Sequence, residues 1–109
     1  MQRDAILAAL QPTFQEVQAA GGAVVVQVKD LTVREREAWR TASANEDGTL
    51  KPDWLLQLLS LAVHDGDHAK LWPTAADVDG PDAIISELAQ AVLRQNGLAA
   101  DSQKEAQGN

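Results

Sequence analysis

The stretch Trp54-Leu55-Leu56-Gln57-Leu58-Leu59-Ser60-Leu61-Ala62-Val63-His64 is the longest apolar run of the chain and decides its fold. Counted together with Asp53, its polar residues recur at spacings of four, three and four, which places them on one narrow stripe of a helix. Because the rest of its surface is apolar, this helix must be enclosed by its own domain or by a partner subunit. We therefore predict a central core helix from Pro52 to about His64, and self-association of the chain through the same surface.

Two further helices are predicted on either side of this segment. Thr32-Val33-Arg34-Glu35 has the Thr-x-x-Glu spacing of a capping box, in which each side chain satisfies a backbone N–H at a helix start. A surface helix should run from here to about Ser43. The amphipathic pattern after Pro81 predicts a last helix, which ends at Asn96-Gly97 because both residues tolerate the left-handed backbone conformation.

The N-terminal segment is predicted to form a short opening helix. Ile6, Leu7 and Leu10 lie on one helical face, and Pro12 stops the helix after about two turns. The first residues, Met1-Gln2-Arg3-Asp4, lack the basic region and long apolar run of a secretory signal. We expect the chain to start in its mature form.

The strongest β signal is Val24-Val25-Val26-Gln27-Val28, which is β-branched at nearly every position. A lone strand leaves its backbone unsatisfied, and Thr13 to Gln18 is the nearest partner, with Ala19-Ala20-Gly21-Gly22 as the turn of a β-hairpin. In the competing interpretation, Thr13 and Glu16 form a capping box and residues 13–20 are helical. The sequence leaves both interpretations open.

The predicted fold class is mainly α: a small helical domain of three to four helices with a β-hairpin near the N-terminus. We assign residues 1–98 to this single domain. The polar residues 99–109 have nothing to bury and are expected to form a disordered tail.

The composition describes an acidic chain of 109 residues with a formal charge of −7 and a pI near 4.6. Such a surface repels phosphate backbones and anionic headgroups, so neither nucleic acid nor membrane is an expected partner. No apolar run reaches the ~20 residues that a membrane-spanning helix needs. The absence of cysteine fits a reducing compartment, and we expect a cytoplasmic protein.

The candidate chemical motifs are weak. His64 and His68 are four residues apart between Asp65 and Asp67, but Gly66 argues against a continuous helix, and solvent-exposed or capping histidines are the simpler interpretation. Asp65-Gly66-Asp67 also lacks the later glycine and glutamate of a calcium loop and is interpreted as a tight acidic turn. We predict no catalytic residue, no metal, no cofactor and no enzymatic activity.

Three residues are predicted to contact a protein partner. Arg36 and Arg40 lie one turn apart on a helix, where like charges disfavour each other unless something acidic neutralises them. That acidic group is either the chain's own Asp65 to Asp82 region or another protein, and both alternatives stay open. Trp72, in a loop before Pro73, is the third candidate. A tryptophan is more often core packing than an interface anchor, and for Trp39 we predict packing.

The order of three motifs resembles the tail assembly chaperones of long, flexible-tailed bacteriophages. The first is Val28-Lys29-Asp30-Leu31-Thr32-Val33-Arg34-Glu35-Arg36, with the leucine, hydroxyl residue and Glu-Arg of that family. The second is Leu58 to Asp65 followed by a glycine turn and Leu71-Trp72, and the third is Val92 to Leu98 with its Asn-Gly-Leu. In the second motif the glycine comes earlier than is usual, and tryptophan replaces the common phenylalanine.

The resemblance implies a protein of the bacterial host cytoplasm that binds the tape measure protein and helps recruit tail tube subunits. It also implies the short form of a product that is often extended by ribosomal frameshifting. The alternative function is an acidic adaptor or antitoxin-like inhibitor, whose charge would face a basic protein partner.

Overall fold

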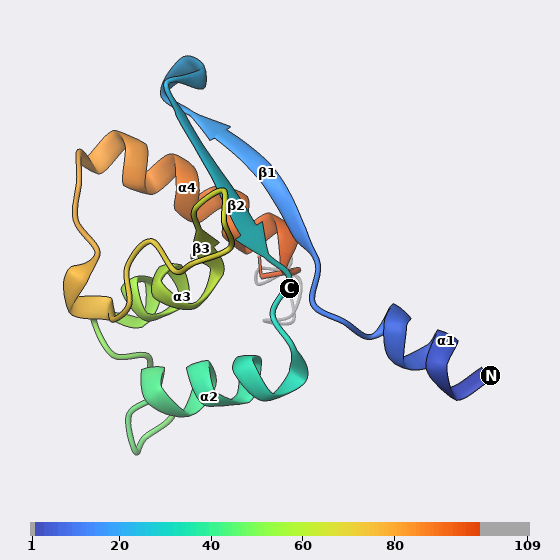
Figure 1. Cartoon of the computed structure of the whole chain (residues 1–109). Helices are drawn as coiled ribbons and strands as arrows, with labels where there is room; N and C mark the ends of the chain where they lie inside the picture. Colours follow the sequence, from blue (N-terminus) through green and yellow to red (C-terminus); the bar gives the residue numbers. More distant parts are fainter. Residues whose placement is uncertain (1, 99–109) are drawn as a thin grey trace, which may run out of the picture.

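The computed structural model describes residues 2–98, which form four α-helices and one three-stranded antiparallel sheet (Figure 1). Two 3-10 turns, η1 and η2, are also present in this part of the chain. In chain order the elements are α1 Gln2–Ala9, β1 Phe14–Ala19, η1 Ala20–Gly22, β2 Val24–Lys29, α2 Val33–Ser43, α3 Trp54–Ala62, β3 Val63–His64, η2 Ala75–Asp77 and α4 Asp82–Gln95.

The hairpin of β1 and β2 decides the open question about residues 13–20 in favour of a strand. Its register runs from Phe14 opposite Lys29 to Ala19 opposite Val24. The valine-rich β2 needs a neighbour for its backbone groups, and the preceding segment supplies one. Gly21 and Gly22, with φ angles of 65° and 97°, make the tight turn between the strands.

The predicted fold class is wrong, because the chain is a mixed α/β structure and not a mainly helical one with a hairpin. A third strand, β3, follows α3 without a break and pairs with the other side of β2, with Val63 opposite Val28 and His64 opposite Gln27. The hairpin covers residues 14–29 and follows α1 in the sequence, so it is not at the N-terminus itself. The central helix therefore ends at Ala62, because the backbone of the next two residues satisfies the open edge of β2.

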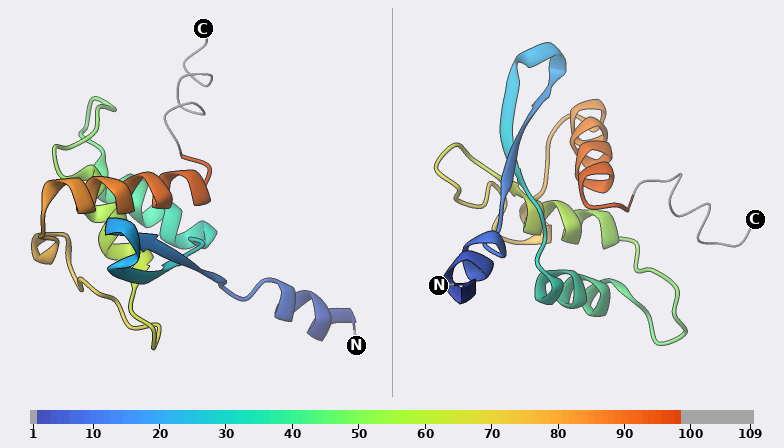
Figure 2. Two further views of the ribbon diagram at one scale, coloured as in Figure 1. Left: turned by 90° about the horizontal axis from the view of Figure 1, so that it is seen from above. Right: turned by 90° about the vertical axis from the view of Figure 1, so that its right-hand side faces the viewer.

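The core lies between the sheet and the helices α3 and α4. Figure 2 shows α4 running beside the sheet, and the sheet face carrying Val26 and Val28 is buried. Leu58 and Leu59 of α3 are fully buried, as the prediction of a central core helix required. Leu88 and Val92 of α4 close the core from the other side.

Local signals place the starts and ends of the flanking helices. Thr32 and Glu35 form the predicted capping box at the start of α2, where the Thr32 hydroxyl accepts from the Glu35 N–H and the Glu35 carboxylate accepts from the Thr32 N–H. Helix α4 ends at Gln95, directly before the predicted Asn96-Gly97 stop, and Gly97 has a φ of 71°.

Helix α1 extends away from the rest of the described chain, as both Figure 1 and Figure 2 show. None of its residues is buried, and the apolar side chains here are open to solvent, with 58% of Ile6 and 70% of Leu10 exposed. The predicted tail, residues 99–109, lies outside the described residues. Within residues 2–98, none of the helices combines the length and apolar character needed to cross a membrane.

Candidate functional site

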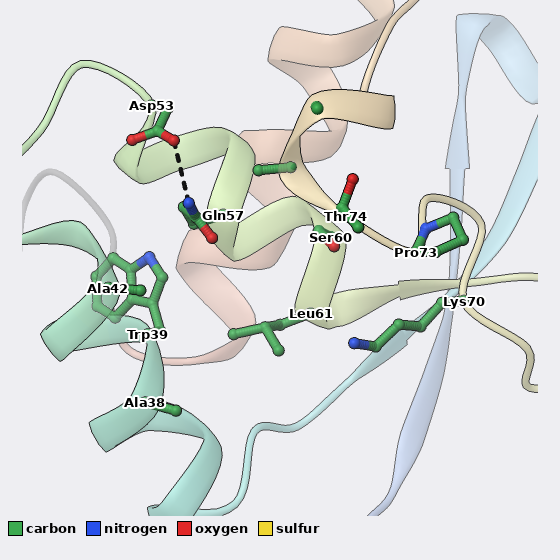
Figure 3. Close-up of a pocket in the computed structure, with 12 residues that line it drawn as sticks. Ala38, Trp39, Ala42, Asp53, Gln57, Ser60, Leu61, Lys70, Pro73 and Thr74 are labelled. Atoms are coloured by element: carbon green, nitrogen blue, oxygen red, sulfur yellow. Dashed lines mark hydrogen bonds between the residues drawn. The ribbon is translucent and has the colours of Figure 1, made fainter.

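An open groove of about 510 Å³ runs between α2, α3 and the segment from Lys70 to Ala76 (Figure 3). One wall is made by the small side chains Ala38 and Ala42 of α2, next to the buried Trp39. The opposite wall is formed by residues 73–76. Small wall residues let the backbone of a visiting helix approach closely, so the groove is shaped for a helical segment.

The floor of the groove is the polar stripe of α3. Asp53, Gln57 and Ser60, whose spacing defined the stripe in the sequence, line the groove beside Leu61. Gln57 donates to the Asp53 carboxylate over 3.0 Å, and the Ser60 hydroxyl donates to the Trp72 carbonyl over 2.8 Å. These bonds hold the polar side chains in place along the groove, while Leu58, Leu59 and Ala62 of α3 are buried in the core.

The two ends of the groove carry opposite charges. Asp53 lies at the end where α3 begins, and Lys70 lies at the other end, beyond the end of α3 (Figure 3). Neither forms an ion pair within residues 2–98. A helix that ran parallel to α3 would place its positive N-terminal end at Asp53 and its negative C-terminal end at Lys70.

Arg36, predicted to contact a partner, also makes a bond within its own chain, and its role in partner binding stays a prediction. Its Nη2 donates to the main-chain oxygen of Asn96 over 2.7 Å, and the side chain is partly buried. Arg40 is exposed and forms a surface ion pair with Glu37 over 2.8 Å. The acidic group that neutralises Arg40 is thus its own neighbour on the helix, and the Asp65 to Asp82 region supplies neither pair within the described residues.

The two tryptophans near the groove differ in exposure. Trp39 is buried, with its Nε1 donating to the Trp54 carbonyl over 2.9 Å, so its predicted packing role is correct. Trp72, the third predicted contact residue, is half-buried and packs against the core without lining the groove. Its role in partner binding stays a prediction.

The first and third sequence motifs of the resemblance meet in space. Gln95 Nε2 donates to the carbonyl oxygen of Val28 and to the Asp30 carboxylate, each over 2.7 Å. Asn96 Oδ1 accepts from the backbone N–H of Leu31 over 2.8 Å. These bonds tie the segment between β2 and α2 to the end of α4.

The second motif joins the same framework through the sheet. The backbone N–H of Leu71 donates to the carbonyl oxygen of Val63 over 3.1 Å, which folds the glycine turn back along β3. Because β3 also pairs with β2, all three motifs contribute to one connected structure beside the groove. They support the groove and do not line most of it.

The acidic turn from Asp65 to Ala69 is stabilised by its own backbone. Asp65 Oδ1 accepts from the N–H groups of Asp67 and Ala69 over 2.8 and 3.1 Å. The bond from the Ala69 N–H, followed by that from the Asp67 N–H, lowers the pKa of the Asp65 carboxyl. The predicted tight turn is therefore correct.

The two histidines around this turn pack against an aromatic ring. Phe14 lies edge-on to His64 and stacked on His68, with ring centroids 5.1 and 3.9 Å away. His64 is buried, and its Nδ1 lies 2.9 Å from the Ala62 carbonyl oxygen. Across residues 2–98, no group of three or more histidine, cysteine or acidic side chains is arranged to hold a metal ion.

Comparisons of the chain with protein-family models, curated proteins and solved structures find no match. The groove is thus interpreted from its own residues. Sequence reasoning missed it, although two signals were present: the polar stripe on a helix that is otherwise apolar, and the four-residue spacing of Ala38 and Ala42 on α2.

Proposed function

We propose that this protein is a tail assembly chaperone of a long, flexible-tailed phage, which binds the tape measure protein and helps recruit tail tube subunits. The observation that carries the proposal is the convergence of the three family-like motifs on one framework. Leu31 and Asn96, which are 65 residues apart, are joined by a hydrogen bond at motif positions.

The groove offers a binding surface suited to this function. A tape measure protein is long and helical, and its amphipathic segments need cover until the tail tube surrounds them. The groove combines small apolar walls with a polar floor and opposite charges at its two ends. It would therefore hold one amphipathic helix in a preferred direction.

Co-expression with the tape measure protein of the same phage tests the proposal. The chain is expected to keep the tape measure protein in the soluble fraction and to co-purify with it. Ala42→Arg, which places a bulky charge in the groove wall, should reduce the co-purified amount about tenfold or more. Thr41→Arg is the matched control, because the same residue is introduced at the adjacent exposed position outside the groove lining.

Two outcomes would contradict the proposal in different ways. A tape measure protein that is equally soluble without this chain, and does not co-purify with it, would remove the chaperone function. Strong weakening of a complex by moderate salt would instead favour the acidic adaptor, because exposed charges are screened over about 10 Å at 0.1 M salt.

A further inference from the structure

Helix α1 lacks the contacts that a helix of its length needs. It has eight residues, and isolated helices shorter than about 12–15 residues are marginal in water. Ile6 and Leu7, and Leu10 directly after the helix, are all exposed, and no residue of α1 is buried against the rest of residues 2–98. Another surface must cover this apolar face if α1 is to persist.

The exposed face of α1 ends in a positive charge. Arg3 precedes Ile6, Leu7 and Leu10 by three, four and seven residues, so all four side chains lie on one side of the helix. Arg3 forms no ion pair within the described residues. The face therefore runs from a cation at the N-terminal end to an apolar C-terminal end.

The groove beside α3 matches this face in length and charge. Eight residues of α1 span about 12 Å, and the groove floor from Asp53 to Leu61 spans the same length along α3. With α1 parallel to α3, Arg3 would meet Asp53, and the C-terminal carbonyl groups of α1 would meet Lys70. The apolar side chains of α1 would then lie between the alanine-lined walls.

The connection to β1 directs α1 away from its own groove. Pro12 has a fixed φ angle, and the residue before a proline is restricted to extended conformations. Thr13 is held by the Asp30 N–H, which donates to its carbonyl oxygen over 2.9 Å, and by its hydroxyl, which donates to the Asp30 carboxylate. The chain thus leaves the sheet in one direction, with α1 pointing outward (Figure 1).

We propose that α1 of one chain docks into the groove of a second copy. The two copies would exchange their α1 helices, which we call the arms, to form a symmetric dimer. The contact is then used twice, as a two-fold axis requires. This proposal does not rest on the chaperone function. Since α1 and a tape measure helix would use the same groove, the dimer would be the resting form and partner binding would displace the arm.

Sedimentation velocity of the purified full chain tests the exchange. The wild-type protein should pass from monomer to dimer as its concentration rises. The variant Ile6→Glu/Leu10→Glu, which places two charges on the docking face, should raise the dimer dissociation constant at least about tenfold. Its control, Ala5→Glu/Ala8→Glu, adds the same charges to the opposite side of α1 and should dimerise like the wild type.

A mixing experiment distinguishes exchange from docking within one chain. Ala42→Arg spoils the groove but keeps the arm, whereas Ile6→Glu/Leu10→Glu spoils the arm but keeps the groove. Each variant alone should be monomeric, and an equimolar mixture should form a heterodimer through the one remaining pair of intact surfaces. Circular dichroism and urea unfolding of each variant show that loss of dimer is not loss of folding.

Charge reversal at Arg3 and Asp53 tests the proposal independently. Arg3→Glu and Asp53→Lys should each weaken the dimer, and the double variant should regain most of the lost affinity, because the pair is restored with opposite signs. A wild-type protein that stays monomeric at all concentrations, or a mixture that yields no heterodimer, would overturn the proposal. Tape measure binding that persists in such a monomer would leave the chaperone function standing.

Discussion

The guanidinium of Arg36 donates a hydrogen bond to the main-chain oxygen of Asn96, with 2.7 Å between Nη2 and the oxygen. The two residues are 60 positions apart in the chain and join the start of α2 to the end of α4. The acceptor belongs to the C-terminal end of a helix, where carbonyl groups carry partial negative charge. A positive side chain there stabilises the fold, which explains why Arg36 faces inward and Arg40 does not.

Replacing the two arginines should therefore have different effects. Arg36→Ala removes a charged hydrogen bond in a partly buried place and should lower the free energy of unfolding by about 1.5–3 kcal/mol. Arg40→Ala removes only an exposed ion pair with Glu37 and should change it by less than about 0.5 kcal/mol. Urea unfolding followed by circular dichroism measures both. Equal effects of the two substitutions would contradict the framework role of Arg36.

Asn96 should be one of the most sensitive polar positions. Its Oδ1 accepts from the Leu31 N–H over 2.8 Å, and its Nδ2 donates to the Val92 carbonyl over 3.1 Å. Asn96→Ala leaves the Leu31 N–H without this acceptor and should cost about 1–3 kcal/mol of unfolding free energy. Gln90→Ala, on the exposed side of α4, is the control and should be neutral or slightly stabilising, because alanine favours helix. Asn96→Ala as stable as this control would refute the expectation.

Glu35 should make stability depend on pH in the acidic range. Burial would raise the pKa of its carboxyl, but the hydrogen bond from Lys29, over 2.7 Å, and that from the Thr32 backbone outweigh burial and lower it. A lowered folded-state pKa stabilises the fold fully above the unfolded value of about 4.5, and this stabilisation is lost as pH falls through the folded value. Urea unfolding from pH 7 to pH 3 should show the gap between wild type and Glu35→Gln closing as pH falls. A gap that does not change with pH would mean that the Glu35 carboxylate and its hydrogen bonds are not the source of the stabilisation.

The tip of the hairpin contains a residue that is not glycine in the left-handed conformation. Ala20 has a φ of 54°, which strains an L-residue, so Ala20→Gly should raise the unfolding free energy by about 0.5–1 kcal/mol. Gly22, with a φ of 97°, gives the opposite case, and Gly22→Ala should lower the unfolding free energy by about 1 kcal/mol. Thermal unfolding compares the two. The turn geometry would be wrong if Ala20→Gly were the more destabilising change.

Local features of the sequence determined several helix boundaries and the core helix. The capping box at Thr32 and Glu35 acts within one turn, and Gly97, with its left-handed backbone, is a local stop signal just after α4, so both signals can be read without distant residues. The apolar surface of residues 54–62 indicated that α3 is a core helix, because a helix that is apolar over most of its circumference must be buried away from water.

Tertiary structure decided the features that depend on distant partners. Val63 and His64 continue the pattern of α3, yet they form β3, because the open edge of β2, some 35 positions earlier, needs hydrogen-bond partners. The sequence placed Arg36 and Arg40 on one helical face, but only the packing of α4 against the start of α2 gives Arg36 its acceptor. The groove arose in the same way: its floor was visible as a stripe of polar residues on α3, whereas its walls come from α2 and residues 73–76, which only the folded chain brings together.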